Sequence, residues 1–322
     1  MGGIGVVAGR KPTPASTDAS FRRYFRVQGA SESFIVMDAP PAEEDCLPFM
    51  RIAGYLEAMQ LNAPRILEAD PERGFLLLTD LGTTQYLDSL VHNPQNAPAL
   101  YADALAALAR IQRRGAVYQA LLPPYDEKLL RFELSLFHDW LCGSHLGIEF
   151  DADAEAAWQD VCTLLVKNAL DQPQVFVHRD YHSRNLMVTA SNNPGILDFQ
   201  DAVEGPLTYD LVSLLKDCYI RWPDEQLQRW SLDFHTGLDD SIREHVGQEQ
   251  FTRDFELMGV QRHLKAAGIF ARLNHRDGKS DYLHDIPRTL QYVIELLPRY
   301  TELEFLVTLI RERCLPALED KR

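Results

Sequence analysis

The stretch HRDYHSRN at residues 178–185, followed by ILDFQ at residues 196–200, is the most informative part of this 322-residue chain. It places one carboxylate at Asp180, an amide at Asn185 and a second carboxylate at Asp198. Phosphoryl transfer from a nucleotide requires such groups, because one carboxylate accepts the proton of the attacking hydroxyl while an amide oxygen and another carboxylate hold Mg²⁺ on the phosphates. Each motif alone is weak evidence, but the two in this order and at this spacing favour a phosphotransferase.

Apolar runs flank the first of these carboxylates, at residues 175–177 and 185–188. We therefore predict a loop between two short strands, with Asp180 as the catalytic base. Asn185 and Asp198 are the predicted Mg²⁺ ligands, because hard oxygen donors suit this ion. The alternative is that Asp180 only makes a turn, and its spacing from the other two groups argues against that.

Further side chains of the same loop are candidates for contact with the substrate. His182 and Arg184 lie inside the loop, where a cation could meet the transferred phosphate. The alternative is that both are exposed loop side chains. A histidine just before such a loop usually fixes its backbone by hydrogen bonds, so His178 is not expected to act as a general base.

Composition limits the classes of partner. The net charge of -15 argues against nucleic acid and against an anionic membrane surface. The five cysteines are scattered without C-x-x-C spacing, which is typical of reduced thiols in the cytoplasm. No run is long and apolar enough to span a bilayer. We expect a cytoplasmic enzyme acting on a small molecule, with no nucleic acid, membrane or obligate protein partner.

Hydrophobic patterning predicts an α+β fold with two lobes. Residues 1–18 are expected to be irregular. Strands are predicted at 21–27, 33–38 and within 73–80, with two or three more, and helices at 43–59, 101–114, 129–142, 207–219, 251–273 and 289–315. The β-rich part, residues 1–81, is the predicted nucleotide-binding lobe. Residues 82–322 form the predicted catalytic and substrate-binding lobe.

The first lobe departs from the pattern of protein kinases. Residues 20–24, SFRRY, stand where a glycine-rich phosphate loop belongs, and no lysine occurs between Lys11 and Lys128. The phosphate-binding lysine of the strand at 34–38 is thus replaced by Met37 or Asp38, depending on alignment.

An arginine must then supply the cation for the nucleotide phosphates. The candidates are Arg22, Arg23 and Arg26, because a planar guanidinium suits phosphate oxygens. The alternative is that these arginines merely solvate an exposed strand. The backbone at Thr79 and Leu81 is predicted to pair with adenine, and Met187 completes the predicted nucleotide site.

These motifs resemble those of the aminoglycoside phosphotransferase and choline kinase family, which has a bilobal protein-kinase-like fold. The resemblance runs from about Ser20 to beyond Tyr219 and includes DASFRRYFR at 18–26, MDAPP at 37–41, LTDLG at 78–82 and CYIRWP at 218–223. It is strongest to members that phosphorylate the anomeric C1 hydroxyl of N-acetylmuramate and N-acetylglucosamine in cell-wall recycling. It therefore implies ATP and Mg²⁺ as cofactors and an amino sugar as the substrate.

Two alternatives remain open. An aminoglycoside or a choline-like cation would suit an acidic protein. A catalytically inactive kinase-like binding module would explain the missing lysine, although the intact Asp180, Asn185 and Asp198 argue against it.

A substrate such as N-acetylmuramate carries a lactyl carboxylate, so an acidic protein needs a cation in contact with it. Arg221 is the predicted cation, and the neighbouring Trp222 is predicted to stack on a sugar face. The alternative is a surface arginine near a helix end and a core tryptophan.

Overall fold

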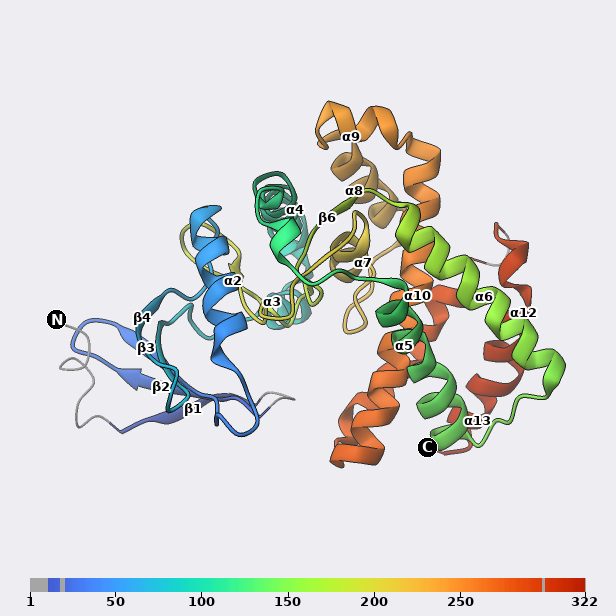
Figure 1. Ribbon diagram of the computed structural model, residues 1–322, viewed down its shortest axis with the longest axis horizontal. Coiled ribbons are helices and arrows are strands. Elements are labelled where there is room, and N and C mark those ends of the chain that lie inside the picture. The colour runs from blue at the N-terminus through green and yellow to red at the C-terminus, as the bar shows by residue number, and fades with distance from the viewer. Residues whose placement is uncertain (1–10, 18–20, 297–298, 322) are drawn as a thin grey trace. The chain divides into compact units, whose positions relative to one another are not determined.

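The computed structural model describes residues 11–17, 21–296 and 299–321. The chain forms two compact units. The first contains the described residues up to Gln119 together with His178–Ala202, and the second contains Ala120–Val177 and the described residues from Val203 onward. Figure 1 shows the helices and strands coloured along the chain. The chain contains a five-stranded antiparallel sheet and many helices, which confirms the α+β prediction.

The first unit contains a five-stranded antiparallel sheet in the order β1-β2-β3-β5-β4. The strands are β1 (Thr13–Thr17), β2 (Arg23–Gln28), β3 (Ser33–Asp38), β4 (Ile66–Asp70) and β5 (Phe75–Thr79). The predicted hairpin at β2 and β3 and the predicted strand at β5 are confirmed.

The expectation of irregular structure before residue 18 was wrong for β1. Its sequence, TPAST, lacks alternating large apolar side chains, so no hydrophobic pattern signals a strand. Backbone pairing with β2, which begins at Thr13 opposite Arg26, forms it instead. A proline is tolerated in such a strand because β1 lies at the edge of the sheet. Asp18, Ala19 and Ser20 of the predicted phosphate loop lie outside the described residues.

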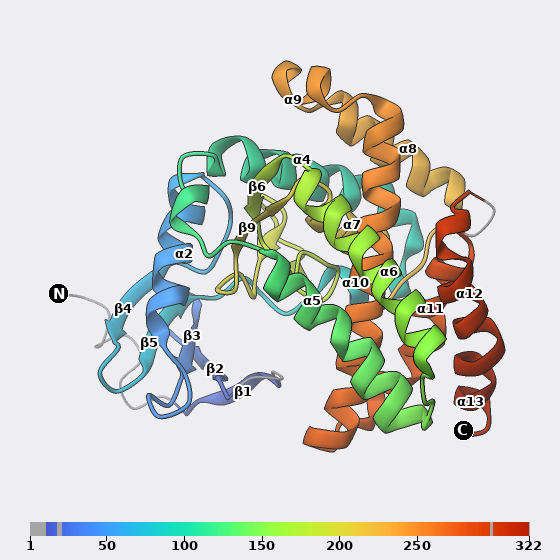
Figure 2. The ribbon, with the colours of Figure 1, turned by 45° about the vertical axis from the view of Figure 1, so that its right-hand side comes forward.

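Helix α2 (Cys46–Ala58) follows β3 in the chain and lies beside the sheet in Figures 1 and 2. The Asp45 side chain caps its start by accepting a hydrogen bond from the Leu47 amide. Phe49 is buried on this helix and lies 4.8 Å, between ring centroids, from the buried Phe199. The predicted helix at 43–59 is thus confirmed, and its packing reaches the segment that carries Asp198.

The rest of the first unit supports the loop around Asp180. Helices α3 (Tyr86–His92) and α4 (Ala97–Gly115) precede a short hairpin of β7 (Leu186–Met187) and β8 (Gly195–Ile196). The buried Tyr181 hydroxyl donates a hydrogen bond of 2.8 Å to the Ala104 carbonyl of α4. The loop is therefore fastened to a long helix one residue from Asp180.

The second unit is mainly helical. Its one described strand pair joins β6 (Gln174–Val177) to β9 (Val203–Pro206). The α-helices are α5 (Glu127–Leu136), α6 (Ala152–Asp171), α7 (Tyr209–Leu215), α8 (Asp224–Thr236), α9 (Asp240–His245), α10 (Gln248–Asp277), α11 (Ile286–Ile294), α12 (Glu304–Leu309) and α13 (Leu315–Glu319). The long helix α10 packs against α5, α6, α7 and α11 (Figure 2).

Three helix predictions in this unit needed correction. The helix expected at 289–315 is broken, because α11 ends at Ile294 and α12 begins at Glu304. The helix expected at 129–142 continues as a π-helix over Phe137–Leu146, and the helix expected at 207–219 ends at Leu215. Helix α6 was not expected.

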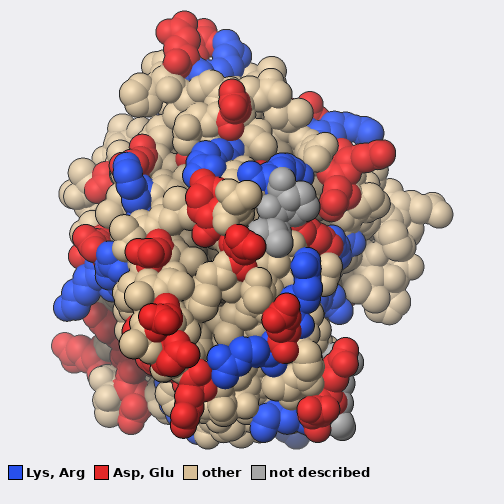
Figure 3. All heavy atoms as spheres, turned by 90° about the vertical axis from the view of Figure 1, so that its right-hand side faces the viewer, with Lys and Arg blue, Asp and Glu red and all other residues tan. Residues whose placement is uncertain are grey.

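Two properties of the structure bear on the membrane and nucleic-acid partners that the sequence argued against. No helix in the described part of the chain is long and apolar enough to cross a membrane. Figure 3 shows one face of the molecule, on which acidic and basic side chains are interspersed and no large basic patch is visible.

Candidate active site

The loop between β6 and β7 is folded around the main chain of Asp180. The carbonyl of this residue accepts a hydrogen bond of 3.0 Å from the His182 amide and another of 3.0 Å from Asn185 Nδ2. The Asp180 amide donates to His178 Nδ1 at 3.2 Å. These bonds fix the backbone on both sides of the Asp180 carboxylate, as a catalytic base requires.

The second predicted carboxylate lies beside the same amide. Asn185 Nδ2 donates to Asp198 Oδ2 at 3.2 Å, and Gln200 Nε2 donates to Asp198 Oδ1 at 2.8 Å. The two hydrogens of the Asn185 amide therefore point to oxygens, which leaves its Oδ1 atom as the donor for a cation. The structure thus brings together Asp180, Asn185 and Asp198, as their spacing predicted.

The donor set of this site fits Mg²⁺. Asn185 and Asp198 offer a neutral and a charged oxygen, the hard ligands that Mg²⁺ takes from proteins. No group of three or more histidine, cysteine or acidic side chains within the described residues could hold a metal ion. An ion held by Asn185 and Asp198 would therefore complete its shell with nucleotide phosphates and water.

Backbone conformation singles out the same segment. Arg179, next to the predicted base, has φ 79°, and Asp198 itself has φ 61°. Residues other than glycine adopt this left-handed region uncommonly, at a cost of about 1–3 kcal/mol each, and such residues cluster at functional sites. The fully buried Phe199, packed on Phe49, holds the strained turn in place.

His178 is confirmed as a backbone support. Its ring is fully buried, and burial lowers the pKa of His178 to about 4. The ring is therefore neutral at neutral pH, and its Nδ1 accepts the hydrogen bond from the Asp180 amide. His182 is buried and Arg184 is partly exposed in the same turn, and their contacts with a substrate remain predictions.

The arginines predicted to bind phosphate are paired with acids. Arg22 lies 2.9 Å from Glu44, and Arg23 lies 2.5 Å from Asp38. The two pairs differ in exposure, because the side chain of Arg22 is 10% exposed and that of Arg23 is 62% exposed. Arg23 of β2 faces Asp38 of β3 across the ladder, and Asp38 is one of the two positions at which the lysine was expected.

Arg26 instead fastens the segment after β5. Its guanidinium donates to both carboxylate oxygens of Asp80, at 2.5 and 3.0 Å, and to the Gly82 carbonyl at 2.7 Å. Burial pushes the pKa of Asp80 upward, but the hydrogen bonds from Arg26, Ser33 and the Gly82 amide together lower it. Arg26 therefore holds Asp80 and Gly82, at the predicted hinge, in place.

The residues predicted to contact adenine lie in this hinge and in the β7–β8 hairpin. The Thr79 amide donates to the Arg65 carbonyl at 3.0 Å, so adenine would have to pair with the Thr79 carbonyl. A Cβ added at Gly195 would lie 3.0 Å from Leu81 Cδ1 and 3.1 Å from Met187 Cβ. Gly195 therefore allows Leu81 and Met187 to approach the same point.

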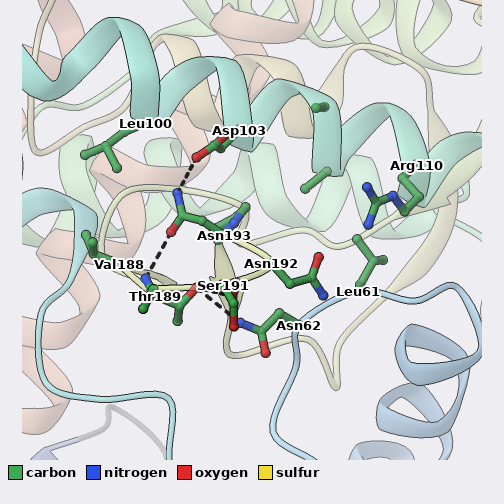
Figure 4. A pocket seen from close by; sticks show the side chains of 14 residues that line it. Leu61, Asn62, Leu100, Asp103, Arg110, Val188, Thr189, Ser191, Asn192 and Asn193 are labelled. Atoms are coloured by element: carbon green, nitrogen blue, oxygen red, sulfur yellow. Dashed lines mark hydrogen bonds between the residues drawn. The ribbon is translucent and has the colours of Figure 1, made fainter.

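Two polar pockets flank this hairpin within the first unit. One of about 600 Å³ lies between α4 and the loop joining β7 to β8, where Asn193 donates to Asp103 at 2.8 Å (Figure 4). The other, of about 550 Å³, is lined in part by Thr79 and Leu81. The pockets share Leu61, Asn62 and Asn192.

The predicted carboxylate-binding residue of the second unit is already paired. Arg221 lies 2.5 Å from Glu295, and its guanidinium carbon lies 4.8 Å from the ring centroid of Tyr292. Trp222 is half-buried and meets Trp230 edge to face, with centroids 6.0 Å apart. A role for either residue in sugar binding stays a prediction.

Some functional residues escaped prediction. Gln200, which bonds Asp198, occupies the position of the glycine in a D-F-G-like turn, and Glu44 and Asp38 hold the arginines. The substitution at Gln200 was visible in the sequence. The two acids gave no signal, because ion pairs depend on how distant segments meet.

The sheet, the helix beside it and the Asp180 loop define a phosphotransferase of the kinase-like class. Residues 11–245 match the model of the phosphotransferase enzyme family, and the chain belongs to that family. The match covers the sheet, the loop and the helices as far as α9.

Individual relatives narrow the comparison. The chain is 50% identical over 309 residues to the N-acetylmuramate/N-acetylglucosamine kinase of Pseudomonas putida, which covers 96% of this chain and 90% of that protein. A choline kinase from Streptococcus pneumoniae has a similar structure, with a TM-score of 0.60, 12% identity and coverage of 88% of this chain and 94% of the other. An ADP-bound aminoglycoside phosphotransferase has a TM-score of 0.54, 12% identity and the same coverage. These two structures support the fold alone.

Proposed function

We propose that this chain is an ATP- and Mg²⁺-dependent kinase that phosphorylates the anomeric C1 hydroxyl of N-acetylmuramate and N-acetylglucosamine. Residues 1–81 bind the nucleotide, and residues 82–322 carry the catalytic groups and bind the sugar. The observation that carries the kinase assignment is the convergence of Asp180, Asn185 and Asp198 through the Asn185 amide. The 50% identity to a curated kinase of these two sugars supports the substrate.

In the proposed reaction Asp180 acts on the sugar. Its carboxylate accepts the proton of the C1 hydroxyl while the C1 oxygen forms a bond to the γ-phosphorus and the bond from that phosphorus to the leaving ADP oxygen breaks. The hydrogen bonds that the Asp180 carbonyl accepts and its amide donates fix the backbone from which the carboxylate projects. Most of the catalysis in such a reaction is positioning and charge stabilisation.

Asn185 and Asp198 hold the metal in this proposal, through Asn185 Oδ1 and the Asp198 carboxylate. When bound, Mg²⁺ neutralises charge on the β- and γ-phosphate oxygens. Gln200 and Asn185 orient the Asp198 carboxylate from two sides. The left-handed conformation of Asp198 gives the carboxylate its direction.

Cell-wall recycling is the biological context that this substrate pair suggests, and the cytoplasm is the expected compartment. The rival substrates are an aminoglycoside and a choline-like alcohol. Neither is favoured by a contact within the described residues, and the solved choline and aminoglycoside enzymes share only 12% identity with this chain.

The test is an ATP-consumption assay over a panel of N-acetylmuramate, N-acetylglucosamine, an aminoglycoside and choline. Turnover of the two amino sugars is expected. The product of N-acetylglucosamine should fail a reducing-sugar assay and show a phosphorus-coupled anomeric proton by NMR, because a C1 phosphate blocks the reducing end. A product that is still a reducing sugar would place the phosphate on another hydroxyl. ATP consumption with choline alone would show that the substrate is a choline-like alcohol and not an amino sugar.

A further inference from the structure

The side-chain amide of Gln200 is bound at one atom and without a partner at the other. Gln200 is 7% exposed. Its Nε2 atom donates to Asp198 Oδ1 at 2.8 Å and to Asp201 Oδ2 at 3.4 Å. Its Oε1 atom is closed off from solvent and accepts no hydrogen bond from any of the described residues. A buried acceptor without a partner is unfavourable, and it is uncommon in folded proteins.

The two carboxylates beside the amide decide which of its atoms is which. The oxygen and nitrogen of a glutamine amide are told apart by their hydrogen bonds. Both atoms that face Nε2 belong to carboxylates, which only accept hydrogen bonds when ionised. An exchange of the two amide atoms would set an oxygen against two other oxygens. The atom without a partner is therefore Oε1, on the same planar group that contacts Asp198.

The groups around Asp198 do not supply a donor for this oxygen. Asn185 Nδ2 already donates its two hydrogens to the Asp180 carbonyl and to Asp198 Oδ2. Solvent water does not reach the oxygen either, because it is buried. A cation bound at Asp198 would satisfy Gln200 Oε1, since a carboxamide oxygen is a ligand for hard cations.

We propose that Gln200 Oε1 is a third protein ligand of the Mg²⁺ ion, beside Asn185 Oδ1 and the Asp198 carboxylate. Mg²⁺ binds six ligands and usually keeps several waters, so Gln200 takes the place of one of these waters. The glycine that stands at this position in a D-F-G turn has no side chain to offer. This inference rests on the proposed function, because it requires an ion held by Asn185 and Asp198.

The variant Gln200→Met tests the inference, because it keeps an unbranched stem and removes the amide. Mn²⁺ replaces Mg²⁺ in the test, since its electron paramagnetic resonance reports binding, and the protein is saturated with the non-hydrolysable analogue β,γ-imido-ATP. The Kd for Mn²⁺ is expected to rise at least about tenfold, because loss of the outer partners of a metal site already costs about 10–100-fold.

The number of waters on the ion separates ligation from orientation of Asp198. Water labelled with oxygen-17 broadens the Mn²⁺ resonance according to the number of waters bound to the ion. Gln200→Met should bind one water more than the wild type, because water fills the position that the amide oxygen leaves. Gln200→Glu keeps an oxygen at the same distance along the chain, so it should bind no more waters than the wild type.

Gln112→Met is the matched control. Gln112 lies on α4 of the same compact unit and is also 7% exposed, so this variant removes an equally buried amide. Its Mn²⁺ affinity and water count should equal those of the wild type. Tm measured without metal reports whether each variant is folded. If Gln200→Met does not fold, Gln200→Ala gives the same measurement with a smaller side chain.

Asp198→Asn distinguishes a failure of the proposed function from a failure of this inference. A wild type that binds Mn²⁺ no more tightly than Asp198→Asn would refute the metal site of the proposed function. With that site confirmed, two outcomes would overturn the assignment of Gln200. Weaker binding with an unchanged water count in Gln200→Met would limit Gln200 to orienting Asp198. An unchanged Kd together with an unchanged water count would remove Gln200 from the metal site.

Discussion

The segment at residues 178–202 and the N-terminal sheet belong to the same compact unit. They differ in the interactions that their charged side chains make. In the segment, the side-chain amide of Asn185 donates hydrogen bonds to the Asp180 carbonyl and to the Asp198 carboxylate. In the sheet, Arg23 and Arg26 each meet a carboxylate at 2.5 Å. The groups predicted to act in catalysis follow the kinase pattern, while the arginines predicted to bind the phosphates are paired with acids of the scaffold.

This difference between the segment and the sheet indicates which functional groups of such an enzyme can vary in residue type and position. A proton acceptor and metal ligands must meet the reacting atoms in a fixed geometry, so their types and spacing are constrained. A phosphate needs only a nearby positive charge, which a side chain from a neighbouring strand can supply. Arg23 of β2 is paired across the ladder with Asp38 of β3. In the proposal, this arginine supplies the positive charge that a lysine on β3 supplies in protein kinases.

The largest effect is expected at Asp180. The Asp180→Asn variant should lower kcat by about 10²–10⁴-fold, because it removes the general base while keeping the shape of the side chain. Affinity for ATP should be nearly unchanged, as measured by nucleotide titration. The exposed Asp201 provides a control, and Asp201→Asn should retain wild-type activity. A near wild-type kcat for Asp180→Asn would remove the segment from catalysis.

Replacing the metal ligand should have the next largest effect. Asp198→Asn is expected to abolish most turnover and to raise the Mg²⁺ concentration needed for half-maximal activity, because a carboxylate is exchanged for a neutral amide. Steady-state rates over a Mg²⁺ titration measure both quantities. An unaltered Mg²⁺ dependence would contradict the assignment.

The arginines test the other side of the comparison. Arg23→Ala should weaken ATP binding by about 1–3 kcal/mol, as expected for a charge-assisted hydrogen bond, with little loss of Tm. Arg26→Ala should instead lower Tm, because it leaves the buried Asp80 without its bidentate partner. Arg22→Ala is the comparison for Arg23→Ala, because Arg22 is also paired with an acid but its side chain is less exposed. If all three variants keep the wild-type KM for ATP, the cation lies elsewhere in the chain.

The smallest effect concerns pH and His178. Its pKa of about 4 in the folded protein is below the ordinary value, so the unfolded chain binds more protons between about pH 4 and 6.5. Stability should therefore be complete above this window and fall as pH drops through it, by about 1 kcal/mol between roughly pH 7.5 and 5.5. Urea unfolding at the two values measures the change. His178→Asn should show a smaller drop, and an identical drop would assign the effect to other groups.

The candidate catalytic residues could be proposed from the sequence because their spacing is local and their chemistry restricts the residue types. The strands β2, β3 and β5 could be predicted because they carry apolar runs bounded by turns. Strand β1 could not, since TPAST pairs through its backbone and carries no pattern. The partners of Arg22, Arg23 and Arg26 could not be predicted either, because they come from other parts of the fold.

The same limit applies to charge. An isolated lysine in a sequence reads as a surface residue, and nothing in the run around Lys216 distinguishes it from Lys265. Only the structure shows that both are buried.

The ring contact between Phe49 and Phe199 couples the position of α2 to the conformation of the turn at Asp198. A ligand that moves Phe199 together with Asp198 would also change the packing of α2, and a ligand that moves α2 would then affect Asp198 by the same coupling free energy. The buried faces of these two rings thus turn a packing contact into a route for communication. Slower amide hydrogen exchange along α2 on addition of magnesium and nucleotide would register it.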